Sequence, residues 1–176
     1  MAKASPRRPT APLKVQDMGI GRADWFMLSS TRKVNKSYPH ETAAADLFVT
    51  YYRYIEAWSY EPFVGSARAD RGMKLSGKTF YFEVDLSTEN LRIIEDKIKA
   101  YIRYGRDTGE QFYVVFDIVG NDASGVNRRT SDIGALLDRY SLANQFSLAS
   151  HLTLTESGLE DEVLFSPEGR YSFASI

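Results

Sequence analysis

Glu83 and Asp85 form the residue pair whose types and spacing most suit chemistry. They lie two positions apart in a segment where Phe80, Phe82 and Val84 alternate with polar residues. A period of two is typical of a strand that buries one face. The two carboxylates would then point the same way, about 6–7 Å apart by strand rise. Two such charges repel each other unless water screens them or a cation neutralises them.

Asp70 and Lys97 are the residues expected to complete this group. The turn at Ser76-Gly77-Lys78 can place segment 67–75 beside segment 79–86, so that three carboxylates could hold one divalent ion. Carboxylate oxygens favour hard cations such as Mg²⁺ or Mn²⁺. Lys97 borders the apolar stripe of the next helix and could stabilise developing negative charge. The expected catalytic residues are Asp70, Glu83, Asp85 and Lys97, with the three acids as metal ligands.

A structural explanation of the same residues stays open. Half-exposed strands often carry polar residues on their outer face, so an E-x-D spacing also arises by chance. Lys97 stands beside Glu95 and Asp96, as is common on a solvated helix face.

The composition restricts the chemistry further. A length of 176 residues suits a single domain, and 43% hydrophobic residues suffice for a sizeable core. The 22 basic and 23 acidic residues nearly cancel, so overall charge attracts neither nucleic acid nor membrane. The lack of cysteine excludes disulfides and thiolate metal sites. Neither a membrane span nor a secretory signal is visible, so we expect a cytoplasmic protein without a membrane partner.

The chain divides into a lead-in and one α/β domain. Residues 1–36 predict a basic flexible arm with a short lead-in segment, and residues 37–176 predict the domain. Ser87 and Thr88 could cap a helix that ends near Gly105. The expected elements are a helix over 41–58, extended segments at 58–64 and 67–75, a strand over 80–86, a helix over 87–105, a strand over 112–119, a helix over 127–142, and strands over 146–153 and 162–165.

Several of these residues together resemble the replication-relaxation family of plasmid and mobile-element proteins, which looks like a branch of the PD-(D/E)xK nuclease superfamily. The superfamily core is a helix, three strands, a helix and a strand. The resemblance therefore implies a restriction-endonuclease-like α/β fold, here with an additional C-terminal helix and edge strands. It covers residues 40–119 and rests on His40-Glu41, Trp58, Glu61, Arg68-Ala69-Asp70, the run from Phe82 to Glu89, Lys97 and Tyr101.

The resemblance also implies roles for single residues. Asp70 would match the aspartate of the first motif, with Ala69 in place of the usual proline, and Glu83 the acid of the second. The superfamily usually has lysine where this chain has Asp85, so Lys97 would have to supply the missing ammonium group. The family usually carries an N-terminal winged-helix domain, for which residues 1–36 are too short.

Three functions stay open from the sequence. The first is a metal-dependent DNA endonuclease or nickase of a plasmid, phage or other mobile element. The second is a catalytically inactive nuclease-fold protein that acts as a DNA-binding replication or mobilisation accessory. The third is an assembly component, with protein partners or as a homo-oligomer, whose 11 tyrosines and 10 phenylalanines partly serve an interface. The expected phosphate-binding residues are Arg68, Arg71, Lys74, Arg128 and Arg129, with the basic arm.

Overall fold

The computed structural model describes residues 13–14, 25–26, 38–120, 122–140 and 145–176. The expected basic arm lies outside these residues, apart from β1 (Leu13–Lys14) and β2 (Trp25–Phe26), which pair with each other. The described chain is a mixed α/β structure with four helices around a seven-stranded sheet. None of the described helices is both long and apolar enough to cross a membrane.

The sheet combines parallel and antiparallel pairs. Its order is β11-β10-β9-β8-β7-β6-β3. The three central strands β7, β8 and β9 are parallel, and the strands on either side run antiparallel to their neighbours. The strand bounds are β3 Ile55–Tyr60, β6 Arg71–Leu75, β7 Lys78–Asp85, β8 Tyr113–Ile118, β9 Phe146–Ser150, β10 Leu164–Ser166 and β11 Gly169–Tyr171.

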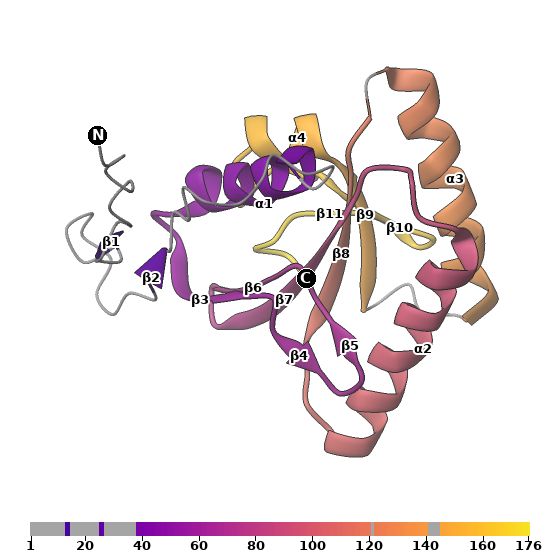
Figure 1. Cartoon of the computed structure of the whole chain (residues 1–176), viewed down its shortest axis with the longest axis horizontal. Coiled ribbons are helices and arrows are strands. Elements are labelled where there is room, and N and C mark those ends of the chain that lie inside the picture. Colours follow the sequence, from indigo (N-terminus) through magenta and orange to yellow (C-terminus); the bar gives the residue numbers. More distant parts are fainter. Residues whose placement is uncertain (1–12, 15–24, 27–37, 121, 141–144) are drawn as a thin grey trace, which may run out of the picture.

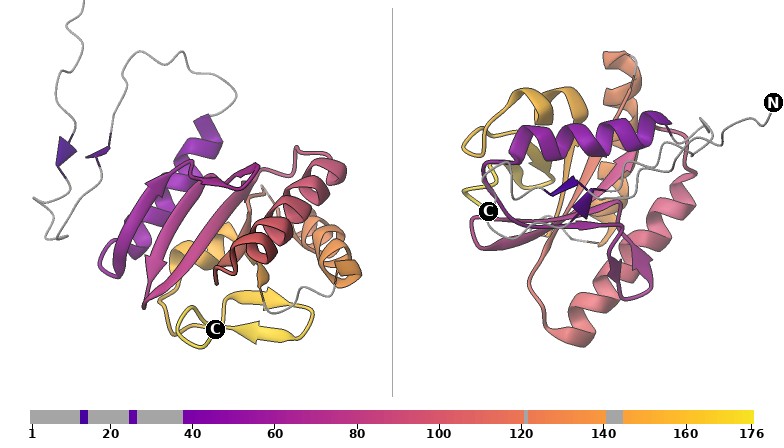
Figure 2. Two further views of the ribbon diagram at one scale, coloured as in Figure 1. Left: turned by 90° about the horizontal axis from the view of Figure 1, so that it is seen from below. Right: turned by 60° about the vertical axis from the view of Figure 1, so that its left-hand side comes forward.

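Helices cover both faces of the sheet. Helices α1 (Tyr38–Tyr51) and α4 (His151–Glu156) pack on one face and contact each other. Helices α2 (Leu91–Thr108) and α3 (Ala123–Tyr140) lie side by side on the opposite face. Figure 1 shows the sheet between these two layers, and Figure 2 shows the same layers from below and from the side. Each face of the sheet therefore has its own apolar core.

The tight turn predicted at Ser76-Gly77-Lys78 connects β6 and β7 in the structure. Ser76 and Gly77 both have positive φ, at 50° and 77°, and Leu75 pairs with Lys78 across them. Two residues with positive φ make the tight hairpin turn whose twist matches that of the flanking strands. The strand pair expected around Asp70 and Glu83 is thereby fixed in register. A small hairpin of β4 (Phe63–Val64) and β5 (Ala67–Arg68) is inserted before β6.

The predicted first helix is too long by seven residues, because it ends at Tyr51 and not at Trp58. Ile55 and Trp58 instead lie on β3 and are both buried against α1. Their spacing of three resembles a helical repeat because the strand has a β-bulge between Ile55 and Ala57. A bulge inserts one residue and brings positions three apart onto one face. The predicted repeat is therefore confirmed up to Tyr51, and only its continuation to Ile55 and Trp58 comes from the bulge.

Helix α2 begins and ends later than the sequence predicts. Its N-cap is Asn90, whose side chain accepts from the amide of Arg92, and not Ser87 or Thr88. Its C-cap is Gly109 with φ of 71°, while Gly105 lies within the helix. The predicted apolar stripe is confirmed, since Ile94, Ile98 and Tyr101 are buried and Leu91 packs against them.

The segment from Phe146 changes from strand to helix halfway. Strand β9 ends at Ser150, whose side chain caps α4 by accepting from the amide of Thr153. His151 is thus the first residue of a helix, where the sequence predicted a polar strand residue. A serine that caps a helix offers the backbone a partner that a strand would not use.

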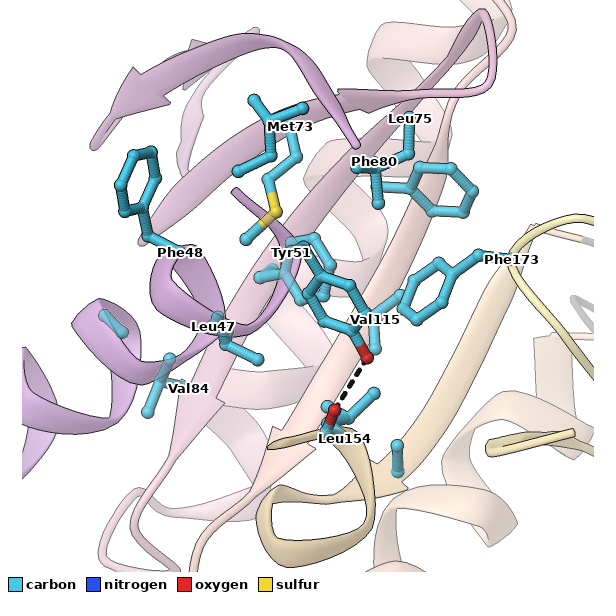
Figure 3. Packing of buried hydrophobic residues seen from close by; sticks show 14 of the residues in the cluster. Leu47, Phe48, Tyr51, Met73, Leu75, Phe80, Val84, Val115, Leu154 and Phe173 are labelled. Carbon is cyan, nitrogen blue, oxygen red and sulfur yellow. Dashed lines mark hydrogen bonds between the residues drawn. The ribbon is translucent and has the colours of Figure 1, made fainter. Parts of the chain in front are cut away.

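The core between the sheet and helices α1 and α4 is largely aromatic. Tyr51 is fully buried beside Phe173, and its hydroxyl donates to the carbonyl of Leu154 at 2.7 Å. Figure 3 shows this bond within the cluster, with Leu47 and Met73 around it. The bond joins α1 to α4 inside the core.

We predict that Tyr51→Phe lowers the free energy of unfolding by about 1–2 kcal/mol, because a buried carbonyl loses its donor. Urea unfolding followed by circular dichroism measures this. Tyr52→Phe is the matched control, since the Tyr52 hydroxyl contacts the exposed Arg53, and it should change stability by less than about 0.5 kcal/mol. Equal losses in the two variants would contradict the prediction.

Candidate functional site

The chemically interesting side chains gather at one edge of the sheet. Glu83 and Asp85 stand at the carboxyl end of β7, Asp117 near the carboxyl end of β8, and His151 directly after β9. These are the three parallel strands, so their carboxyl ends meet at the same edge (Figure 1). Open α/β sheets place ligand sites at this edge. The edge is therefore the candidate site.

Asp70 joins this edge from the antiparallel side of the sheet. It directly precedes β6, and its amide donates to the carbonyl of Phe82 at 3.1 Å. Its carboxylate accepts from the amide of Val84 at 2.8 Å and lies 3.1 Å from Nε2 of His40. Since Arg71 pairs with Phe82, the register sets Asp70 opposite Glu83. The structure thus places Asp70 beside Glu83, as expected.

Glu83 is a buried carboxylate with two donors from α2. Lys97 Nζ lies 2.8 Å from Oε2, and the hydroxyl of Tyr101 donates to Oε1. Lys97 also lies 3.2 Å from the carboxylate of Glu89. Lys97 is one quarter exposed, whereas the side chain of Glu83 is 2% exposed. Lys97 thus reaches the end of strand β7, as the sequence predicts.

Burial and neighbouring charges have opposite effects on the pKa values of Glu83 and Lys97. Burial raises the pKa of Glu83 to about 7, with Asp70 adding to the rise and the ammonium of Lys97 opposing it. For Lys97, burial alone would lower the pKa, but the carboxylates of Glu83 and Glu89 outweigh it and raise the pKa. Lys97 therefore remains a cation. The raised pKa of Glu83 marks this carboxyl as a candidate functional group.

Asp85 points to the same face as Glu83 but has a different partner. Both of its oxygens face Arg129 of α3, at 2.5 Å from Nε and 3.2 Å from Nη2. Both side chains are buried. Such a bidentate pair leaves Asp85 little capacity to bind a metal ion. The structure brings Asp70, Glu83 and Lys97 together and holds Asp85 apart from them in an ion pair.

The predicted phosphate-binding residues divide into two groups. Arg71 is buried, with Nη2 at 3.0 Å from Glu41 and its guanidinium over the ring of Tyr60. Arg129 is buried against Asp85. These two cannot contact phosphate without losing their partners. The exposed members of the set are Arg68, Lys74 and Arg128.

A second acid–base pair lies on the opposite face of the sheet. Oδ2 of the buried Asp117 lies 2.8 Å from Nδ1 of His151, while Oδ1 has no partner. Nε2 of His151 lies 3.6 Å from Asp46 of α1. Residue spacing does not predict this pair, because 34 positions separate its members. The available signal was Asp117 itself, the single charged residue of an otherwise apolar strand.

A hard divalent ion fits part of this site. In the part of the chain that the structure describes, no three His, Cys, Asp or Glu side chains gather closely enough to hold a metal. Asp70 and Glu83 lie opposite each other in register, and each carboxylate oxygen can accept beyond its present donor. Asp85 fits less well, because it already neutralises Arg129. Asp70 and Glu83 are the residues that would hold Mg²⁺ or Mn²⁺.

Comparisons of the chain with family models, with curated proteins and with solved structures gave no match.

We predict that His151→Gln destabilises the fold more at pH 6 than at pH 9. Although burial alone would lower the pKa of His151, Asp117 and Asp46 outweigh it and raise the pKa above the unfolded value of 6.5. The stabilisation is therefore complete below that unfolded pKa and is lost as pH rises through the folded pKa. The expected loss at pH 6 is about 1–2 kcal/mol.

Urea unfolding at both pH values checks this prediction. The control is Asp46→Asn, because Asp46 is half exposed and lies 3.6 Å from His151, and it should cost less than about 0.5 kcal/mol. A loss for His151→Gln that is the same at pH 6 and pH 9 would refute the charged pair.

Proposed function

We propose that the chain is a DNA-processing protein of a plasmid, phage or other mobile element, acting as a metal-dependent endonuclease or nickase of the PD-(D/E)xK type. Its reactive centre consists of Asp70, Glu83 and Lys97. The order α1, β3, β6, β7, α2, β8 supports this proposal, because it is the helix, three strands, helix and strand of that superfamily. The hairpin β4–β5 is an insertion into that order.

The observation that carries the proposal is the contact between Lys97 and Glu83. Nuclease sites of this type need a cation beside the two acids, and Asp85 occupies the position where lysine is usual. Lys97 reaches Glu83 from a helix 14 positions later in the sequence, at 2.8 Å. Asp70 stands opposite Glu83, directly before the neighbouring strand β6. This contact supports Lys97 as the ammonium group that the resemblance requires.

Each residue has a defined task in this proposal. Asp70 and Glu83 would hold the divalent ion, which when bound polarises a phosphate and lowers the pKa of a water molecule. Lys97 stabilises negative charge on the reacting phosphate, since its ammonium is partly exposed at the edge. Glu83 also holds Lys97 in place through their contact at 2.8 Å. Arg68, Lys74 and Arg128 are exposed and would bind the DNA backbone, with Arg68 exchanging its surface pair with Glu61 and Lys74 its surface pair with Glu56 for phosphate.

A non-catalytic DNA-binding role is the second candidate. It is favoured by the full set of protein partners around Glu83, which Tyr101 and Lys97 satisfy without an ion. It is also favoured because no group of three metal-ligating side chains occurs among the described residues. In this case the acids and Lys97 stabilise the fold, and binding depends on the exposed basic residues alone.

We predict that Lys97→Met lowers the rate of DNA cleavage by about 10²–10³-fold, because the developing charge loses its cation. Asp70→Asn should have an effect at least as large, since an amide binds a divalent ion poorly. Cleavage of supercoiled plasmid in Mg²⁺ or Mn²⁺, with and without chelator, measures both. Lys99→Met is the matched control two positions along the same helix, where Lys99 is exposed and pairs with Glu95.

The results separate the two candidates. Cleavage that requires the metal, survives in Lys99→Met and is lost in Lys97→Met supports the nuclease. No cleavage by the wild type, together with DNA binding that weakens steeply with salt, supports the binding protein. Cleavage that is undiminished in Lys97→Met and Asp70→Asn would show that this site is not the reactive centre.

A further inference from the structure

Asp85 and Arg129 form a connection that the proposed chemistry does not use. The guanidinium of Arg129 takes both oxygens of Asp85, and its Nη2 also donates to the backbone carbonyl of Glu89 at 2.8 Å. Arg129 comes from α3, whereas Asp85 and Glu89 flank the loop between β7 and α2. A single buried side chain thus holds both ends of this loop.

The loop itself has a conformation that needs support. Ser87 has a φ of 61°, in the left-handed region that residues other than glycine rarely adopt. Its amide donates to Oδ1 of Asp85 at 2.8 Å. Asp85 therefore stabilises the strained backbone of Ser87, and Arg129 fixes the side chain of Asp85. The hydrogen bonds from the Ser87 amide to Asp85 and from Arg129 to the Glu89 carbonyl hold the loop on this course.

The clamped loop delivers a carboxylate to Lys97. Glu89 lies within the segment that Arg129 holds, and its side chain lies 3.2 Å from Lys97 Nζ. Lys97 therefore sits between Glu83 on the strand and Glu89 on the loop. A shift of the loop would move Glu89 and leave Lys97 with one carboxylate. The path from α3 to the ammonium group passes through Arg129, the Glu89 backbone and the Glu89 side chain.

We propose that Asp85 and Arg129 are positioning residues that set the place of the Lys97 ammonium through the 86–90 loop. Their catalytic meaning rests on the proposed function, but the clamp itself does not. This role would explain why the chain has Asp85 at the position where the superfamily usually has lysine. Asp85 holds the loop that steadies a lysine supplied from α2. Arg129 is a structural partner and not a phosphate-binding residue, because its buried guanidinium already donates from Nε and Nη2 to Asp85 and to the Glu89 carbonyl.

The ammonium group of Lys97 can be observed directly by ¹H–¹⁵N spectroscopy of ¹⁵N-lysine protein. Two carboxylates should slow its proton exchange enough to give a resolved signal, which Lys97→Met assigns. We expect Arg129→Gln to abolish this signal. Arg128→Gln, at the exposed neighbouring position, should preserve it. Arg129→Lys keeps a charge but loses the fork, and should leave a weaker signal.

Arg129→Gln also leaves Asp85 buried without its countercharge, which can unfold the protein. The double variant Asp85→Asn/Arg129→Gln removes both charges together and should fold, as judged by circular dichroism. It should still lose the Lys97 signal, because an amide pair does not hold the loop as tightly. A folded double variant with an unchanged Lys97 signal would overturn the proposal.

Cleavage kinetics test the catalytic meaning separately. If the wild-type protein cleaves DNA, Arg129→Gln and the double variant should each lower kcat by about 10–100-fold with little change in KM. Such an effect is expected for residues that orient a catalytic group. Unchanged kcat would overturn the positioning role. If the wild type cleaves nothing, the proposed function fails, and the Lys97 signal alone still decides whether the clamp positions the ammonium.

Discussion

The structure depends on the accommodation of one buried carboxylate, that of Glu83. Glu83 is 1% exposed, and a buried carboxylate is costly unless donors and a positive charge accompany it. Both come from α2, where Lys97 and Tyr101 lie four positions apart on the same helix face. Helix α2 must therefore begin where these two residues reach β7. The cap at Asn90 and the clamped loop before it set that start.

The same edge of the sheet carries a second arrangement on its other face. Both histidines of the chain occur there, His40 beside Asp70 and His151 beside Asp117. Each pair ties a helix to a strand, because His40 belongs to α1 and His151 to α4. Asp70 lies between the two faces, since it contacts His40 and raises the pKa of Glu83. Asp70 thus has a neighbour on each face, His40 on α1 and Glu83 on β7.

The sequence predicted what depends on local spacing. Alternation along β7 placed Glu83 and Asp85 on one face, and the stripe of α2 placed Lys97 near the strand ends; the structure has both. Long-range partners were out of reach. Nothing in the spacing shows that Arg129 is buried against Asp85, 44 positions away, so it was predicted to bind phosphate. The bulge in β3 could not be predicted for a related reason. Only the pairing of β3 with β6 shows that Ile55 and Trp58, three positions apart, belong to a strand and not to a helix.

The central claim is that Asp70 and Glu83 together form a divalent-ion site beside Lys97. Paramagnetic broadening by Mn²⁺ in a ¹H–¹⁵N spectrum tests it most directly, since broadening falls steeply with distance from the ion. The account predicts that the amides of Asp70, Glu83 and Val84 broaden first, at low Mn²⁺. Broadening that begins at exposed acids such as Asp107 and Asp138, or none at all, would contradict it.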